Sequence, residues 1–454
     1  MFTTILFLWI IFQTFYFGSF GPDLGIIKEI RPHRVLYILT VVSFLSLLVR
    51  RRAAIRKLEI QDYLMLLVTL SCTISFIVSG AHYDQTVGKN KWLSALFNIT
   101  YYPLTAYLCV RALPYRPQML ISVLKLLCAI GVYLSITGFC EHYELRNFVW
   151  PDYIMDESLG TQFGRARGPF MESVAMGRVL TMALGAFLIM STRLRGVKAL
   201  WNNTFIFLSL GAVYFTYTRG PWIGAGCLLL AFFIFRTPVR RMVKMLCLGI
   251  ALAALTGLSS KFSVSGPTLF ERRQSTVSDR VVTWIVSAKM IEDKPLHGIG
   301  FGRFNLEWEK YFQRTHSKIE FQGFDGSHNT FLTMGAEVGV PTLLVFLLMM
   351  YYQVRMCAGV YKRLGEDREL ERSFVVMVMG LAVMYVFTGW FSDLRWNTVQ
   401  NTLMFICFAL VCGLKHHLEE QDLSPAAAEA ADVVPVEEPA RMSYTASDVG
   451  YGGF

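Results

Sequence analysis

Apolar residues in the 454-residue chain gather in blocks that short polar stretches separate. A helix of roughly 20 apolar residues crosses the hydrocarbon core of a bilayer, and most of the blocks approach that length. We therefore predict an all-α polytopic membrane protein with about twelve transmembrane helices. The expected helices are residues 3–20, 34–49, 62–80, 93–110, 119–140, 169–191, 203–218, 221–235, 239–258, 328–352, 372–391 and 396–414.

Longer polar segments lie between and after these blocks. Residues 141–168 and 259–327 form two long loops, and amphipathic helices are expected in the second. Residues 419–454 are rich in Ala, Glu and Pro and show no apolar period, a composition typical of disorder. We expect one transmembrane domain, residues 1–418, followed by a disordered tail.

Composition supports a membrane protein. The chain is 54% hydrophobic and only 17% charged, with a mean hydropathy of +0.43. A soluble chain averages roughly 45–50% apolar and about 25% charged residues. The net charge of +10 could suggest nucleic-acid binding. The positive-inside rule explains it better, because most Lys and Arg residues fall in short loops between apolar blocks.

The short loops also predict the orientation. Loops after even-numbered helices are rich in Lys and Arg, as in residues 50–57 and 236–244, whereas the opposite short loops carry few. Cytoplasmic loops carry this excess, so both termini are expected in the cytoplasm. The long loops 141–168 and 259–327 then face the other side of the membrane.

The nine cysteines give no sign of a metal site or a disulfide framework. Nearly all lie inside apolar blocks, with no CxxC and no paired spacing in a loop. The run EHYE at residues 141–144 lacks a second cluster that would complete a coordination set. No metal and no cofactor are therefore expected.

Arg219 lies in the very short turn of TYTRGPWIGAG. An arginine there can simply extend its side chain to the membrane interface. However, the turn is on the side that otherwise avoids positive charge, and a guanidinium can bind a phosphate through two hydrogen bonds. We favour the second interpretation.

Arg280 lies in the long loop, in VSDRVVTWIVSAKM. Ser278 is a plausible N-cap, and the apolar residues that follow recur at helical spacing, so an amphipathic helix is predicted. Arg280 then opposes the helix dipole, which is easier to explain if it meets an anion. A solvated charge is the alternative.

His328 opens the stretch SHNTFLTMGAEVGVP. Ser327 can cap a helix that begins at His328, and Gly335 and Gly339 allow close helix packing. A helix N-terminus disfavours a protonated imidazole, so His328 should stay neutral, the form that accepts a proton from a hydroxyl. Taken alone, the histidine would be a polar cap on a buried helix.

Two further motifs lie near these residues. GIGFGRF follows a helix and a proline rather than a strand, so we reject a dinucleotide site and expect a flexible turn. Arg165 and Arg167, in GRARGPF, add positive charge to the same surface.

Together these stretches resemble the O-antigen ligase and polymerase superfamily of membrane glycosyltransferases. The resemblance covers about residues 160–345. It rests on RARGPF, YTRG, Arg280 with Trp284, PLHGIGFG, SHN and EVGVP, in this order.

The resemblance implies inverting, metal-independent glycosyl transfer at the periplasmic face of the bacterial inner membrane. The donor would be a glycan on undecaprenyl pyrophosphate, and the acceptor a glycan or a lipid. Arg219 and Arg280 would interact with the pyrophosphate, and His328 would act as base on the acceptor hydroxyl. The candidate substrate-binding residues are Arg165, Arg167, Asn329 and Arg303.

Several alternatives stay open. Ligases in the family often carry GxxG after the histidine segment. Here Thr342 stands three residues after Gly339, where the second glycine would be, so ligase and polymerase both remain. A flippase for a lipid-linked sugar is the main rival, although polar residues are sparse inside the predicted spans. A scaffold that works with polysaccharide export or chain-length partners would leave the two arginines and the histidine without a shared purpose.

Overall fold

The computed structural model describes residues 1–15, 32–54, 57–80, 91–159, 163–235, 238, 240, 242–244, 267–313 and 327–432. Within these residues the chain forms helices and no strand, so the prediction of an all-α membrane protein is confirmed. The predicted helix at 239–258 lies mostly outside the described residues.

Seven of the described helices are long and apolar enough to cross a membrane. Two shorter apolar helices, α1 (Phe2–Phe15) and α9 (Arg219–Ile234), pack beside them. The seven are α2 (Pro32–Val49), α3 (Ile60–Val78), α6 (Pro117–His142), α7 (Ser173–Ser191), α15 (Val340–Arg363), α16 (Glu369–Gly389) and α17 (Thr398–Asp432).

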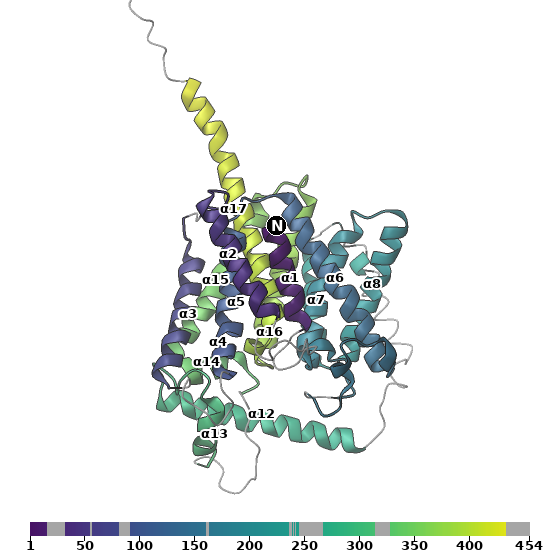
Figure 1. Cartoon of the computed structure of the whole chain (residues 1–454), viewed down its shortest axis with the longest axis vertical. Coiled ribbons are helices and arrows are strands. Elements are labelled where there is room, and N and C mark those ends of the chain that lie inside the picture. Colours follow the sequence, from purple (N-terminus) through teal and green to yellow (C-terminus); the bar gives the residue numbers. More distant parts are fainter. Residues whose placement is uncertain are drawn as a thin grey trace, which may run out of the picture.

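The centre of the bundle is α7, almost all of whose residues are buried. It packs against α6 and α8 (Gly196–Phe215) (Figure 1). It also packs against α9, which in turn packs against α16. Glycines allow these approaches: a Cβ at Gly131 would lie 2.5 Å from that of Ala183, and one at Gly224 only 2.6 Å from Met384. Close backbone contact of this kind is how helices associate in lipid.

The predicted span at 93–110 is divided into short pieces. Helix α4 (Lys91–Leu96) leads into the π-helical turn η2 (Phe97–Tyr101) and then into α5 (Tyr102–Arg111), which packs along α17. Pro103 explains the division, because proline has no N–H to donate to the preceding turn.

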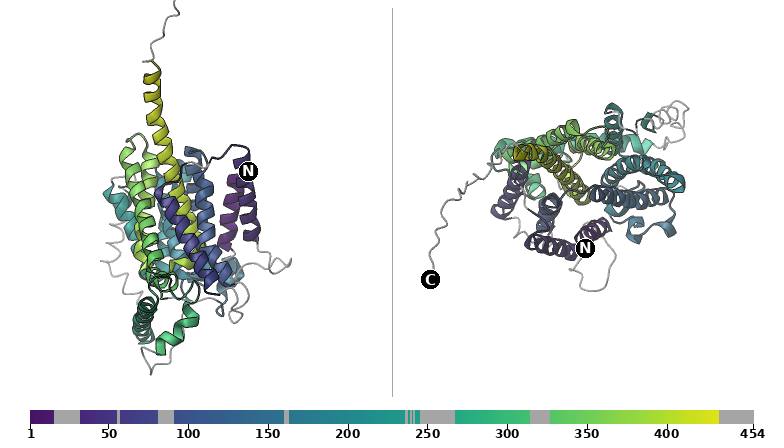
Figure 2. Two further views of the ribbon diagram at one scale, coloured as in Figure 1. Left: turned by 90° about the vertical axis from the view of Figure 1, so that its left-hand side faces the viewer. Right: turned by 90° about the horizontal axis from the view of Figure 1, so that it is seen from above.

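Helix α12 (Pro267–Asp293) lies across one end of the bundle, together with α13 (Phe304–Gln313) (Figures 1 and 2). Val286, Met290, Phe304 and Trp308 form a small core of their own with Ala336. The predicted start of this helix at Ser278 is wrong. Pro267 stands at the first helical position, which proline favours, so Arg280 lies inside the helix rather than at its positive end.

Two other predicted boundaries are wrong. The helix expected at 328–352 is divided at Gly339 into α14 (Thr330–Val338) and α15, because Gly339 adopts a φ of 86° and Pro341 follows in the first turn of α15. The expected boundary at residue 419 falls inside α17, which continues to Asp432 and extends beyond the bundle (Figure 1). Residues 433–454 lie outside the described part of the chain.

Candidate active site at the α12 end of the bundle

The N-terminal ends of α7 and α9 lie side by side and fix the position of Arg219. The hydroxyls of Ser173 and Thr218 are 2.9 Å apart, and a Cβ at Gly177 would lie 2.5 Å from Pro221. Thr218 precedes Arg219, the first residue of α9, and the side chain of Arg219 is exposed. The guanidinium therefore stands beside the free N–H groups of a helix N-terminus, a favourable setting for an anion.

Arg165 and Arg280 join Arg219 at this end of the bundle. The amide of Ala166 donates to the carbonyl of Phe215 over 3.0 Å, which ties the Arg165 segment to the end of α8. Arg280, half-buried on α12, has a lowered pKa, first because of burial and then because of the positive charges of Arg219 and Arg165. Three arginines from three segments thus form one cluster of like charge, which we call the arginine cluster.

His328 lies on a strained turn just before α14. It has a φ of 53° and an exposed side chain, whereas its neighbours Ser327 and Asn329 are buried. The Ser327 hydroxyl lies 2.9 Å from the carbonyl of Asn329 and from the hydroxyl of Thr333. The turn is therefore held from both sides, and the imidazole projects from it.

The cap of α14 is Asn329, so the prediction that Ser327 caps a helix beginning at His328 is wrong. The Asn329 side-chain oxygen accepts from the amides of Phe331 and Leu332 over 2.9 and 3.1 Å. An asparagine satisfies free amides well at this position. Its buried Nδ2 has no hydrogen-bond partner among the described residues, so it can donate to a ligand.

Helix α12 connects the histidine turn to the arginine cluster. The Thr283 hydroxyl lies 2.8 Å from the carbonyl of Arg280 and 3.2 Å from the carbonyl of Ser327. The Thr283 hydroxyl therefore contacts the backbone carbonyls of both Arg280 and Ser327, the residue before His328. The structure thus brings together Arg165, Arg219, Arg280 and His328, four of the residues predicted from the sequence.

Both ends of α14 are fixed by residues 392–395, which follow α16. At the first turn, the Thr330 hydroxyl donates to the carbonyl of Ser392 and accepts from the amide of Leu394, each over 2.9 Å. At the last turn, the buried carboxylate of Glu337 pairs with Arg395, which also binds Asp393 over 2.7 Å. We call these contacts the α14 clamp.

The glycine-rich segment after α12 also has a defined partner, although the sequence predicted only a flexible turn. The amides of Ile299 and Gly300 donate to the carbonyls of Ala336 and Glu337 over 2.8 and 2.9 Å, at the last turn of α14. Gly298 has a φ of 67°, and a Cβ there would lie 2.4 Å from the Glu337 backbone. The glycines permit this close backbone pairing.

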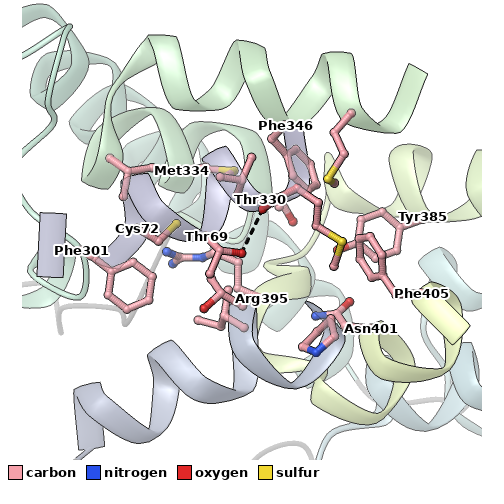
Figure 3. Close-up of a pocket in the computed structure, with 17 residues that line it drawn as sticks. Thr69, Cys72, Phe301, Thr330, Met334, Phe346, Tyr385, Arg395, Asn401 and Phe405 are labelled. Atoms are coloured by element: carbon pink, nitrogen blue, oxygen red, sulfur yellow. Dashed lines mark hydrogen bonds between the residues drawn. The ribbon is translucent and has the colours of Figure 1, made fainter. Parts of the chain in front are cut away.

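A small cavity lies beside the α14 clamp (Figure 3). Its lining is mostly apolar, and its polar members include Thr69, Thr330, Arg395 and Asn401. The cavity volume of about 60 Å³ holds a few water molecules, each of which needs roughly 10–15 Å³ by this measure. It is too small for a sugar, so it does not compete with the arginine cluster as a substrate site.

Two predicted substrate-binding residues lie apart from the cluster. Arg167 is fully buried, where it pairs with Glu141 and donates to the carbonyls of Ile154, Asp156 and Leu159. Arg303 is half-buried and contacts the carbonyl of Ser79 and the carboxylate of Glu307. Their substrate-binding roles stay predictions, but these contacts give each a structural purpose.

Glu172 and Asp393 are two carboxylates near the candidate site that the sequence did not single out. Burial raises the pKa of Glu172 to about 7, the positive charge of Arg178 opposes this rise, and the negative charge of Asp393 adds to it. Glu172 stands at the N-cap position of α7, directly before Ser173, so it lies within one residue of the contact that positions Arg219. Because Glu172 and Asp393 are far apart in the chain, no local sequence pattern indicated that they interact.

Comparison with known protein families gives a match to part of the chain. Residues 204–347 match the family described as O-antigen ligase. The matched segment includes Arg219, Arg280, Arg303, His328 and Asn329 but not Arg165 or Arg167. No curated protein matches the chain.

Proposed function

Since residues 204–347 belong to the O-antigen ligase superfamily, we propose that the chain transfers or polymerises an undecaprenyl-pyrophosphate-linked glycan at the periplasmic face of the bacterial inner membrane. The family supports a ligase- or polymerase-type role in surface polysaccharide synthesis. The observation that carries the finer proposal is the arginine cluster beside His328.

The arginine cluster suits a pyrophosphate leaving group. The lowered pKa of Arg280 reflects burial and repulsion by Arg219 and Arg165, so the cluster is electrostatically unfavourable without an anion. A pyrophosphate relieves this repulsion, and its charge grows as the glycosidic bond to it breaks. Cations fixed in place before the reaction stabilise that developing charge.

His328 suits the role of base. In the proposed reaction, an acceptor hydroxyl oxygen attacks the anomeric carbon, the bond from that carbon to the pyrophosphate oxygen breaks, and the imidazole takes the hydroxyl proton. The neighbouring arginines and the first turn of α14 favour a neutral imidazole. Attack from the face opposite the leaving group inverts the anomeric centre, and no step requires a metal ion.

Purified full-length protein tests this proposal, with undecaprenyl-pyrophosphate glycan as donor, candidate acceptors, EDTA, and no ATP. Arg219→Ala, Arg280→Ala and His328→Ala are each expected to lower the rate of transfer at least about 100-fold, the range of one catalytic group. Arg363→Ala is the matched control, because Arg363 pairs with Asp422 at the opposite end of the bundle.

The product also separates the alternatives. A ladder of lipid-linked glycans indicates a polymerase, and glycan attached to a different lipid indicates a ligase. Full activity in all three variants contradicts the catalytic assignment. Accumulation of donor on the cytoplasmic leaflet in cells, without loss of transfer in vitro, indicates a flippase.

A further inference from the structure

At the end of the bundle opposite the arginine cluster, three metal-ligating side chains converge from two helices. Glu59 stands directly before α3, and Cys412 and His416 lie on α17. One ligand atom of each residue lies within 4.8 Å of the other two. Cys412 and His416 are four residues apart, so they share one face of the helix.

The two carboxylate oxygens of Glu59 have different neighbours. Oε2 accepts from Lys415 and Gln61 over 2.6 and 3.0 Å. Oε1 is buried, has no hydrogen-bond partner among the described residues, and lies 3.3 Å from Nε2 of His416. Two ligands of one tetrahedral zinc ion stand roughly 3.3–3.5 Å apart, so this pair already has the required spacing.

His416 is oriented by a second carboxylate. Its Nδ1 lies 3.5 Å from Oε2 of Glu419, on the other side of the ring. In metal sites a carboxylate at the remote nitrogen fixes the tautomer and makes the ligating nitrogen more basic. The ring therefore turns Nε2 toward Glu59 and Cys412.

The charges around the three residues balance before a cation binds. Glu59, Asp62 and Glu419 are negative, whereas Arg111, Lys415 and Arg363 are positive: Arg111 binds Asp62 over 2.7 Å, Lys415 binds Glu59, and Arg363 lies 3.6 Å from Glu419. The types of ligand, rather than the net charge, therefore favour a metal ion, because a carboxylate, a thiol and an imidazole face one another.

We propose that Glu59 Oε1, Cys412 Sγ and His416 Nε2 bind a zinc-class divalent cation that links α3 to α17. Binding forms a sulfur–metal bond and releases the thiol proton of Cys412 to solvent. One oxygen, one nitrogen and one sulfur ligand match the preferences of Zn²⁺ and leave a fourth position for water.

The test uses purified full-length protein titrated with Co²⁺, a spectroscopic substitute for Zn²⁺. We expect the near-ultraviolet band of a thiolate–cobalt bond and its loss when Zn²⁺ is added. Cys412→Ser is expected to lose this band, and His416→Ala to weaken Co²⁺ binding at least about 10-fold. The controls are Cys407→Ser, a buried cysteine on the same helix, and His417→Ala, whose ring lies against Tyr115.

Thermal unfolding provides a second measurement of metal binding. Zn²⁺ is expected to raise the Tm of the unaltered protein, Cys407→Ser and His417→Ala by about 3 °C, but not that of Cys412→Ser. No cobalt–thiolate band in the unaltered protein overturns the proposal. So does a band that survives in Cys412→Ser or disappears equally in Cys407→Ser.

Discussion

The backbone at His328 limits which side chains can replace the imidazole without disturbing the turn. A φ of 53° lies in the left-handed region, which asparagine and glycine enter more readily than alanine does. We therefore expect His328→Asn to keep the Tm within about 2 °C of the unaltered protein and still to lose at least about 100-fold in transfer rate. Thermal unfolding and the donor–acceptor assay measure the two effects.

The same variant separates catalysis from folding. His328→Ala removes the imidazole and also adds strain at the turn, so it should lower the Tm more than His328→Asn does. Substantial transfer by His328→Asn would contradict the role of His328 as base.

Arg165 and Arg167 stand two residues apart, but their substitution should affect stability and transfer rate in opposite ways. Arg167→Met leaves the buried Glu141 carboxylate without its cation, so a loss of about 3–5 kcal/mol in unfolding free energy is expected. Arg165→Met should leave stability within about 1 kcal/mol and lower the transfer rate by at least about 10-fold. Denaturant unfolding in detergent, together with the transfer assay, checks both expectations.

A single sequence can identify the charges that need an explanation but not the role of each. Arg219, Arg280 and His328 stood out because their charge or position conflicted with the local pattern, and the structure brings them together. The sequence did not distinguish the roles of Arg165 and Arg167. The carbonyls that surround Arg167 come from residues 154–159, and their position depends on how that segment folds.

At the level of elements, the α14 clamp determines where the histidine turn lies. Thr330→Val keeps the volume of the side chain but removes both hydrogen bonds to residues 392–394. We expect a loss of about 1–2 kcal/mol in stability and a lower kcat with little change in KM. Thr402→Val is the control, since the Thr402 hydroxyl donates to the carbonyl of Thr398 within its own helix.

The end of α7 should make stability depend on pH. The pKa of Glu172, about 7 in the folded protein, is above its ordinary value of 4.5. A raised pKa means that the folded state favours the proton, so this stabilisation is complete below about pH 4.5 and is lost as the pH rises through 7.

Glu172→Gln should therefore raise the Tm at pH 8 and change it little at pH 5. Thermal unfolding of both proteins across this range provides the measurement. Parallel Tm curves would show that Glu172 has an ordinary pKa.

Hydropathy predicted the spans well, because every helix that crosses a bilayer must be apolar for most of its length. It could not predict where helices break or begin. The division at Gly339 depends on Leu296, whose carbonyl would lie 2.3 Å from a Cβ at that position. The start of α12 at Pro267 was missed because Ser278 is also a plausible helix cap.

For the whole molecule, α12, which carries Arg280, and the extended end of α17 lie at opposite ends of the bundle (Figure 1). The loop charges predict that the α17 end is cytoplasmic. Leu296→Cys should then react with a membrane-impermeant maleimide added outside spheroplasts, and Asp422→Cys only after permeabilisation. Both positions are exposed, 73% for Leu296 and 71% for the Asp422 side chain.

Labelling in the reverse order would overturn the predicted orientation and would move the proposed reaction to the cytoplasmic face. Labelling of each variant is compared before and after permeabilisation, so a difference in expression between the variants does not affect the result.

The α14 clamp also bears on how the protein is made. A ribosome delivers α14 well before residues 392–395, the segment that fixes both of its ends. Until α16 has been inserted and that segment has emerged, Thr330 and Glu337 lack their partners, and the histidine turn lacks its anchor. Competence for glycosyl transfer is therefore expected to arise late in biosynthesis, so that an incompletely translated chain in the membrane does not consume lipid-linked glycan.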